Sequence, residues 1–327
     1  MFFIYSATED ARIDVVIAEM MGVSRAEVQK FITQGKVKVD DLVVEKKSFN
    51  LEDGMRVEVE GTEQDSEISY VLPEDIPLNI VFEDEFLLVI NKPSGMIVHP
   101  GAGVSTGTVA NALAYYFQNT LSQSRDAHAD PLRPGIVHRL DKGTSGLLVI
   151  AKTKEVHVQL SEAFEKRSVH KKYLTLVFGT NLPTQGSIEA PITRDSFQRL
   201  KMTVSNKPTA KYALTHFDVL VTKSVPDLNH PVSLLDVEIV TGRTHQIRVH
   251  LASIGYPVVG DEMYGFQKFN QAAYRVYQLT HPFLHSYQLA FTHPVTNKEL
   301  VFHASLPEEL SGILEKMEIN TDLKSEV

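Results

Sequence analysis

The sequence has no cysteine among its 327 residues and no long apolar segment. The first absence excludes disulfide bonds, thiolate catalysis and zinc sites built on cysteine. It also fits a reducing compartment, so we expect a cytoplasmic protein. No apolar run approaches the roughly 20 residues that span a bilayer, and runs such as residues 146–151 have the length of a strand. We therefore expect a soluble protein without a membrane partner.

Several catalytic signatures are also missing. The chain has no Gly-x-x-x-x-Gly-Lys-Ser/Thr phosphate loop and no Gly-x-Gly-x-x-Gly segment after a strand. We therefore expect no nucleotide cofactor. Thirteen histidines are present, but His245 and His250 are five residues apart and no His-Glu-x-x-His motif occurs. Structural or surface histidines are the favoured interpretation, so no metal site is predicted.

The net charge of -9 argues at face value against a partner covered in phosphates, because binding nucleic acid depends on Lys and Arg displacing counterions. The charge is unevenly distributed, however. Residues 133–175 contain nine basic and four acidic residues, whereas residues 61–75 contain five acidic and no basic ones. The first segment therefore predicts a basic stripe inside an acidic protein. For Lys154, Lys166 and Arg167 a solvated helix face is an equally good explanation.

The first 60 residues predict a small domain of two helices and a short sheet. Apolar residues from Ile13 to Met21 have the spacing of one helix face. Ser24, followed by Glu27 three positions later, predicts the start of a second helix, and Gly35 predicts its end. Between residues 37 and 59 the pattern changes to short alternating runs, which indicates strands.

Residues 61–77 are acidic and poor in core-forming residues, which is typical of a linker. A second domain is expected at residues 78–310, followed by a flexible tail at 311–327. Its first segment, residues 80–91, predicts a hairpin whose second arm is a central strand. Further strands are expected at 147–152, 173–179, 209–220 and 233–240, helices at 154–168 and around 247–254, and a long loop at 119–134. Because strands and helices are mixed with few long crossovers, we predict an α+β fold on a mostly antiparallel or mixed sheet with flanking helices.

The segment from Gly135 to Val149 is the densest in candidate catalytic groups. It reads Gly-Ile-Val-His-Arg-Leu-Asp-Lys-Gly-Thr-Ser-Gly-Leu-Leu-Val and places Asp141 in a turn before a buried strand. Arg139 lies two residues before Asp141 and Lys142 directly after it. Such cations favour an ionised, directed carboxylate, as nucleophilic attack requires. Taken alone, the spacing fits a structural salt bridge beside a glycine-rich turn even better.

Two other segments carry polar groups at element ends. Thr-Gly-Arg-Thr-His-Gln-Ile-Arg-Val-His, residues 241–250, predicts a turn leading into a helix with Arg243 near its start and Arg248 further along. A guanidinium fixed on a helix can hold a carboxylate with two parallel hydrogen bonds. Tyr173 follows Lys171 and Lys172 at the start of a strand, where a core tyrosine is the commoner explanation.

Together these segments resemble the large-subunit ribosomal RNA pseudouridine synthases that carry a His-Arg-Leu-Asp motif. The resemblance runs over nearly the whole chain and also includes Asn-Lys-Pro-Ser-Gly-Met-Ile-Val-His-Pro at 91–100, Gly260-Asp261 and Tyr264-Gly265. The chain departs from the family pattern near its C-terminus, where residues 280–286 read Thr-His-Pro-Phe-Leu-His-Ser. This departure bears on RNA contacts in that region.

The N-terminal domain resembles the S4 RNA-binding domain. The similarity lies in Arg-Ile-Asp at 12–14, Ser24-Arg25, Gln29-Lys30, Gly-Lys-Val at 35–37 and Asp53-Gly54. It implies RNA contacts by a small basic face that includes Arg25, Lys30 and Lys36. Residues 1–60 nevertheless contain eight basic and twelve acidic residues.

The resemblance implies an isomerase that converts uridine in RNA to pseudouridine without metal or organic cofactor. Asp141 matches the family's catalytic aspartate, Tyr173 its active-site tyrosine and Arg248 the arginine that pairs with the aspartate. Arg139 matches a residue that helps to fill the gap left in the RNA. Further RNA contacts are expected from the matching motif residues, namely His138, Lys142, Arg243, His245 and Gln246. The target base must leave its stack, and Tyr173 then either takes the final proton or stacks on the base.

The expected substrate is ribosomal RNA, free or in a pre-ribosomal particle, although transfer RNA remains an alternative. We expect the chain to act as a monomer. The principal rival is a non-catalytic RNA-binding or ribosome-assembly factor on the same fold. The intact set of Asp141, Tyr173 and Arg248 argues against it. A metal-dependent nuclease would need clustered acids or histidines at ligand spacing, and the sequence shows none.

Overall fold

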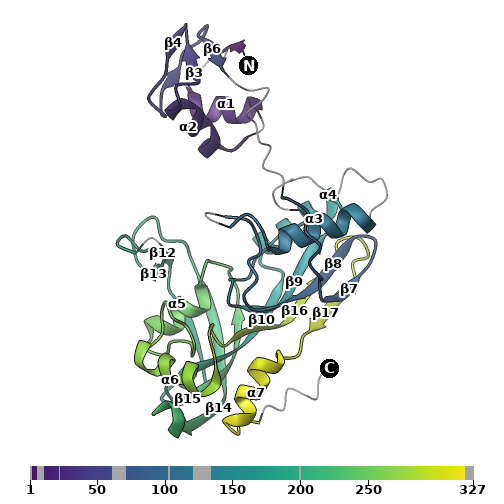
Figure 1. The fold of residues 1–327 in the computed structure, drawn as a ribbon, viewed down its shortest axis with the longest axis vertical. Helices are drawn as coiled ribbons and strands as arrows, with labels where there is room; N and C mark the ends of the chain where they lie inside the picture. Colours follow the sequence, from purple (N-terminus) through teal and green to yellow (C-terminus); the bar gives the residue numbers. More distant parts are fainter. Residues whose placement is uncertain are drawn as a thin grey trace. The chain divides into compact units, whose positions relative to one another are not determined.

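The chain divides into two compact units, Met1–Tyr70 and Val71–Val327. In the computed structural model (Figure 1), the described residues are 2–5, 11–21, 23–60, 71–101, 104–120, 134–198 and 200–320. No helix within these segments is both long and apolar enough to cross a bilayer.

The N-terminal unit contains the two predicted helices, α1 (Ile13–Met21) and α2 (Arg25–Thr33). Ser24 caps α2 as predicted, because its side chain accepts a hydrogen bond from the backbone nitrogen of Glu27. Gly35 follows the helix with a left-handed φ of +70°. The strands form two antiparallel sheets, ordered β1-β6-β3-β4 and β2-β5. Their bounds are β1 Phe2–Ile4, β2 Ala11–Arg12, β3 Val37–Val39, β4 Leu42–Val43, β5 Asn50–Leu51 and β6 Arg56–Val59.

Residues 71–77, which were predicted to belong to the linker, pack onto the second unit. Val71 is buried in the core of that unit. The side-chain nitrogen of Asn111 donates a hydrogen bond to the carbonyl oxygen of Leu72, and the carboxylate of Glu74 accepts one from the backbone of Gly107. The predicted linker is therefore too long at its C-terminal end. Its residues 61–70 lie outside the described part of the chain.

The second unit is built on a mixed sheet of nine strands among the described residues, which confirms the α+β class. The strand order is β11-β14-β15-β10-β16-β9-β8-β7, and β17 pairs with β16. Neighbouring strands are antiparallel except for β16 and β9, which run parallel. The strands are β7 Ile80–Glu83, β8 Leu87–Lys92, β9 Ser145–Ala151, β10 His170–Phe178, β11 Gln185–Glu189, β14 Leu214–Val225, β15 His230–Ile239, β16 Leu284–Thr292 and β17 Glu299–His303. A separate hairpin pairs β12 (Ile192–Arg194) with β13 (Met202–Val204).

Helices cover both faces of this sheet. Side chains alternate between the two faces along each strand, so both faces present apolar residues that helices cover. Helices α3 (Val109–Thr120) and α5 (Gln246–Ser253) pack on the face that contains Leu88, Leu148 and Tyr173. On the opposite face, α4 (Lys154–Glu165) covers β8 and β9. There, α6 (Gln267–Tyr277) and α7 (Glu308–Lys316) cover β10 and β15. Figure 1 shows α3 and α4 beside β8 and β9, and α5 and α6 toward the β14 end of the sheet.

Sequence patterns located most strands of the sheet but not their order. The hairpin at residues 80–91 is confirmed as β7 and β8. β8 is buried on both faces and lies between β9 and β7, as predicted for a strand inside the sheet, although only β7 separates it from the edge. The segment predicted as a loop from residue 119 begins inside helix α3. Its residues 121–133 lie outside the described part of the chain.

The predicted tail after residue 310 is also wrong for the residues that are described. Helix α7 continues to Lys316, and Ile313, Leu314, Met317 and Ile319 are buried in the same core cluster as β10 and α6. The polar composition of this segment concealed one apolar helix face. Residues 321–327 lie outside the described part of the chain.

We expect Leu314→Ala to lower the free energy of unfolding by about 2–5 kcal/mol, because it removes a buried apolar side chain that is 3% exposed and leaves a cavity. Urea unfolding of the full-length protein measures this change. Glu315→Ala is the matched control, since Glu315 is exposed on the same helix. Equal stability of the two variants would show that α7 does not contribute to the core.

Candidate active site

Asp141 lies in a tight turn directly before β9. The carbonyl oxygen of Asp141 accepts a hydrogen bond of 3.0 Å from the backbone nitrogen of Thr144, which closes the turn. The backbone of Gly95 donates to the carbonyl oxygen of Lys142 at 2.8 Å, and the hydroxyl of Ser94 donates to that of Gly143 at 3.1 Å. The segment 93–96 therefore supports the turn from one side and limits the directions that Asp141 can take.

Lys92 in turn supports this segment from inside the core. Its side chain is almost fully buried, and its ammonium group donates to the carbonyl oxygens of Pro93 and Met96 at 2.8 and 2.9 Å. Burial lowers the pKa of Lys92 to about 7, and the negative charge of Asp141 opposes this shift. The lysine is thus a buried support of the site rather than a surface contact for RNA.

The end of the turn is fixed by the close approach of β9 to β16. The two strands pair in parallel at only two positions, Ser145 with His285 and Gly146 with Ser286. Gly146 has a φ of +116°, and a Cβ atom there would lie 2.2 Å from the carbonyl oxygen of Ser286. Glycine is therefore required at this crossing.

Tyr173 is brought to the same region through β16. Tyr173 on β10 pairs with Ser286 on β16, and Ser286 pairs with Gly146 on β9. The three residues are therefore neighbours across three strands. The pairing of β10 with β16 shifts by one residue between Lys172 and Tyr173, and such irregularities often redirect side chains near functional sites. Burial raises the pKa of Tyr173 above its ordinary value, and a hydrogen bond with Ser286 opposes this effect. The phenol is therefore protonated at neutral pH.

Arg248 connects two carboxylates from separate parts of the chain. Its Nε and Nη2 atoms donate to the two oxygens of Asp261 at 2.6 and 2.9 Å, and its Nη1 donates to Oδ2 of Asp141 at 3.2 Å. Asp261 is fully buried and also accepts hydrogen bonds from the backbone nitrogens of Met263 and Tyr264. The two hydrogen bonds with Asp261 thus fix the guanidinium of Arg248. Its remaining nitrogen, Nη1, is directed at Asp141.

The charge on Arg248 is secured by these contacts. Burial by itself would lower the pKa of the guanidinium, but the hydrogen bonds and charge of Asp261, and then those of Asp141, raise it above its ordinary value. Arg248 therefore remains a cation, and its ring contact with Tyr264, at 5.1 Å from the ring centre, is a cation–π interaction.

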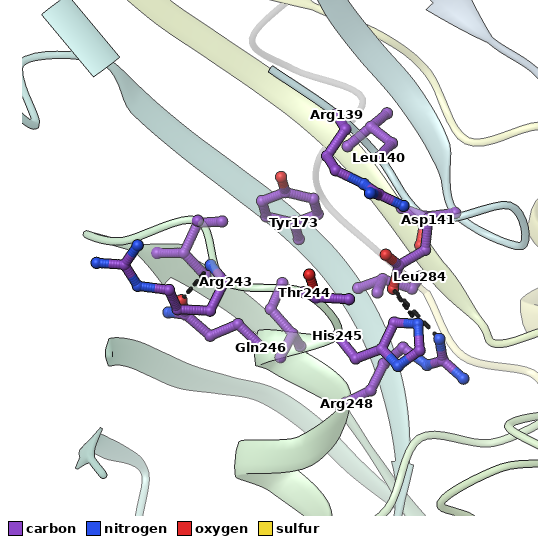
Figure 2. A pocket seen from close by; sticks show the side chains of 14 residues that line it. Arg139, Leu140, Asp141, Tyr173, Arg243, Thr244, His245, Gln246, Arg248 and Leu284 are labelled. Carbon is purple, nitrogen blue, oxygen red and sulfur yellow. Dashed lines mark hydrogen bonds and ion pairs between the residues drawn. The ribbon is translucent and has the colours of Figure 1, made fainter. Parts of the chain in front are cut away.

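Asp141, Tyr173 and Arg248 line one pocket, as the sequence predicted for a common site. The empty space in this pocket is about 480 Å³, including the open solvent at its mouth. Apolar side chains of Leu140, Ile239, Ile247 and Leu284 form part of its wall. In Figure 2, Asp141, His245 and Arg248 gather at one side and Arg243 lies at the other, with Tyr173 between them. The pocket can thus hold a flat ring beside a fixed carboxylate.

The residues predicted to contact RNA differ in their surroundings. Arg139 and Lys142 are exposed on the two sides of Asp141. Arg139 lines the pocket, as does Arg243, whose Nε donates to the carbonyl oxygen of Tyr212 at 3.0 Å. His245 lies beside Asp141, with 3.9 Å between Nε2 and Oδ2, and therefore belongs to the site itself.

Two of the predicted RNA contacts have structural roles. All four hydrogen-bonding positions of the Gln246 amide are used inside the protein, by Thr241, Leu214, Thr215 and the backbone of Arg243. This buried amide fixes the start of α5, and its hydrogen bonds are made inside the protein. The ring of His138 is stacked on Phe164, and its Nε2 accepts a hydrogen bond from the backbone of Val149. Burial lowers the pKa of His138 to about 3, so the ring supplies no positive charge for RNA.

In the N-terminal unit, one predicted RNA contact has a second role. Arg25 pairs with the fully buried Asp14 at 2.9 Å, and Arg12 and Gln29 donate to the same carboxylate. The side chain of Arg25 is still 52% exposed. Lys30 is exposed and Lys36 is half-buried.

The sequence did not reveal the roles of Asp261, Tyr264 and Lys92. Asp261 and Tyr264 lie in segments that the sequence marked as motifs, but their partners are 13 and 19 residues away. Gly260 and Asp261 were named only as part of the resemblance, and nothing in the spacing indicated which cation the carboxylate would meet. Within the described segments, no group of three or more His, Cys, Asp or Glu side chains could hold a metal ion.

Comparison with known proteins identifies the family. A family model described as RNA pseudouridylate synthase matches residues 86–253, which is more than half of the chain. The chain belongs to this family. Members of the RNA pseudouridine synthase family isomerise uridine in RNA, so this synthase is an enzyme of that class. A second model, the S4 domain, matches residues 11–57.

Curated relatives cover most of the synthase. The ribosomal large subunit pseudouridine synthase D of Zymomonas mobilis is 41% identical over 249 residues, which are 76% of this chain and 75% of the relative. The protein with the same name in Vibrio cholerae is 37% identical over 91% of this chain and 89% of its own length. An uncharacterized RNA pseudouridine synthase of Aquifex aeolicus is 39% identical over 95% of each chain.

Solved structures agree in fold. Human RNA pseudouridylate synthase domain containing 4 matches the synthase with a TM-score of 0.56 and 26% identity, over 74% of this chain and 94% of its own. Human RNA pseudouridylate synthase domain containing 1 matches with a TM-score of 0.54 and 24% identity, over 76% of this chain and 98% of its own, and shows the fold alone.

We expect Asp261→Asn to lower the free energy of unfolding by about 3–5 kcal/mol, because it leaves the buried guanidinium of Arg248 without its principal counter-charge. Urea unfolding measures the change. The control is Glu162→Gln, which breaks an exposed ion pair with Lys166 and should change stability little. Wild-type stability of Asp261→Asn would contradict the proposed organisation around Arg248.

Proposed function

We propose that this synthase converts uridine to pseudouridine in large-subunit ribosomal RNA, with Asp141 as the nucleophile. The observation that carries the proposal is the contact of Asp141 with Arg248 at the wall of a pocket that also contains Tyr173. The guanidinium is itself fixed by Asp261, so it holds one carboxylate oxygen in place. The side chain of Asp141 is 16% exposed and can reach a bound nucleoside.

The proposed reaction balances without a co-substrate. Asp141 attacks the nucleoside, at the sugar or at the ring, and the bond between C1′ of the ribose and N1 of uracil breaks. The base turns, C5 bonds to C1′, and the aspartate is released. The hydrogen leaves C5, and N1 of the product carries a hydrogen. Because the product is an isomer of the substrate, the reaction requires no oxidant, reductant or group donor. The proposal therefore includes no metal and no organic cofactor.

Tyr173 is proposed to stack against the uracil ring. The raised pKa of its buried phenol makes the phenolate rare at neutral pH, so the hydroxyl is a poor acceptor for the hydrogen of C5. An aromatic face in a pocket with apolar walls is suited to a flat base that has left its stack. Of the two roles that the sequence left open for Tyr173, we favour stacking.

Access to the nucleoside requires extrusion of the base from the RNA. Extrusion costs less in loops and irregular segments than in paired RNA, which favours such a target. We propose that the exposed Arg139 occupies the gap left by the base and that Lys142 and Arg243 contact phosphates. The N-terminal domain, residues 1–60, is proposed to add RNA affinity through Arg25, Lys30 and Lys36.

The choice of ribosomal RNA rests on similarity. Relatives at 41% and 37% identity are named ribosomal large subunit pseudouridine synthases. We propose that the protein acts on this substrate in the cytoplasm and as a monomer. A chloroplastic RNA pseudouridine synthase of Arabidopsis thaliana is 35% identical, so the fold also serves another compartment.

We expect Asp141→Asn to retain the fold and RNA binding but to form no detectable pseudouridine, because the amide cannot act as the nucleophile. Product formation on ribosomal RNA transcripts and RNA affinity are measured side by side. Asp218→Asn, an exposed carboxylate on β14, is the control and should retain activity. Turnover by Asp141→Asn near the wild-type rate would remove Asp141 from its proposed role.

The substrate is tested by mapping pseudouridines in cells that lack the protein. We expect specific pseudouridines to disappear from large-subunit ribosomal RNA and to return with the wild-type gene but not with Asp141→Asn. Loss confined to transfer RNA would contradict the proposed substrate while leaving the reaction intact. An unchanged map, together with a defect in ribosome assembly that Asp141→Asn repairs, would favour the non-catalytic assembly factor.

A further inference from the structure

A chain of polar contacts leads from the β12–β13 hairpin to Asp141. The backbone nitrogen of Met202 on β13 donates a hydrogen bond of 2.8 Å to the hydroxyl oxygen of Tyr264. The same hydroxyl lies 2.8 Å from Nδ1 of His245. The other ring nitrogen of His245, Nε2, faces Oδ2 of Asp141 at 3.9 Å. A backbone amide of the hairpin is thus linked through two side chains to the carboxylate.

These hydrogen bonds favour one tautomer of His245. A backbone nitrogen can only donate, so the Tyr264 oxygen accepts from Met202 and its own hydrogen is available for Nδ1. Burial lowers the pKa of His245 below its ordinary value; the charge of Asp141 opposes this effect and that of Arg248 adds to it. A neutral imidazole whose Nδ1 accepts a hydrogen bond carries its hydrogen on Nε2. That hydrogen faces Asp141.

The backbone of His245 is held in an unusual conformation. Its φ is +56°, in the left-handed region that residues other than glycine adopt uncommonly. Residues in such conformations persist where the surrounding contacts determine them, and they are frequent at functional sites. Here the contacts of the ring with Tyr264 and Asp141 supply that constraint.

We propose that His245 is a positioning residue for Asp141 and that Tyr264 sets its tautomer and orientation. Arg248 and His245 both approach Oδ2 of Asp141, so together they leave Oδ1 as the oxygen that attacks. The distance of 3.9 Å is longer than a hydrogen bond, and such contacts commonly shorten when substrate binds. Because Tyr264 also binds Met202, the position of the hairpin is coupled to the direction of the nucleophile. This inference rests on the proposed role of Asp141 as the nucleophile.

Two substitutions at His245 distinguish a role of its side chain as a hydrogen-bond donor to Asp141 from a role of its left-handed backbone. The nitrogen of a glutamine side chain is as many bonds from Cα as Nε2, so His245→Gln keeps a donor toward Asp141. The polar atoms of asparagine correspond to Nδ1, so His245→Asn keeps the contact with Tyr264 but not the donor. We expect kcat to fall roughly 10- to 100-fold in His245→Asn and only a few-fold in His245→Gln, with similar KM for RNA. If His245 mattered only for its left-handed backbone, asparagine would be the better substitute.

Tyr264→Phe tests the link to the hairpin. The variant keeps the ring that contacts Arg248 and removes the hydroxyl that holds His245 and Met202. We expect a lower kcat and a raised KM, since both the orientation of Asp141 and the hairpin are affected. Tyr277→Phe is the matched control, because its hydroxyl contacts Asp227 in a different core cluster. It should retain wild-type kcat and KM.

The tautomer is measured directly by two-bond ¹H–¹⁵N correlation spectra of the full-length protein, with the His245 signals assigned from their loss in His245→Gln. We expect the hydrogen on Nε2 in the wild type and a mixture of tautomers in Tyr264→Phe. A hydrogen on Nδ1 in the wild type, or activity of His245→Asn equal to that of His245→Gln, overturns the proposal. If Asp141→Asn proved fully active, the proposed nucleophile would fail, whereas the tautomer measurement would still report on the Tyr264 contact.

Discussion

The organisation of the site depends on one guanidinium shared between two carboxylates. Asp261 is fully buried and holds two nitrogens of Arg248, so the third nitrogen is directed at Asp141. Burying a cation is costly unless it is paired and hydrogen-bonded. The paired Arg248 can therefore remain in a pocket with apolar walls and still present positive charge to the proposed nucleophile. The turn at Asp141 and the segment that contains Asp261 thus meet at this one side chain.

The fold was predictable where local patterns determine structure. Alternating and continuous apolar runs located β7, β8 and β9, and the Ser24 cap located α2. The order of strands was not predictable, because the parallel pairing of β9 with β16 joins residues 140 positions apart. Helix α7 escaped detection since its polar residues dominate the composition, although Leu310, Ile313 and Leu314 share one buried face.

The sequence predicted that Arg248 pairs with Asp141, but it did not predict that Asp261 holds Arg248 in place. The resemblance assigned Asp141, Tyr173 and Arg248 to one site, and all three line one pocket. The sequence treated Gln246 and His138 as RNA contacts because both lie in motifs rich in polar residues. In the structure, Gln246 anchors the start of α5, and the ring of His138 accepts a backbone hydrogen bond from β9. A sequence motif shows which residues occur together. The packing of the side chains shows which of them support the site and which face the substrate.

The crossing of β9 and β16 has a consequence for redesign of the synthase. Gly146 brings two backbones together, and Gly143 leaves room for Pro282 beside the Asp141 turn. A larger residue at Gly146 would force β9 away from β16, and one at Gly143 would push the Asp141 turn away from Pro282. Variants with altered preference for the bases around the target uridine should therefore be sought among exposed side chains at the rim, such as Arg139. The crossing itself has no spare room for a larger side chain.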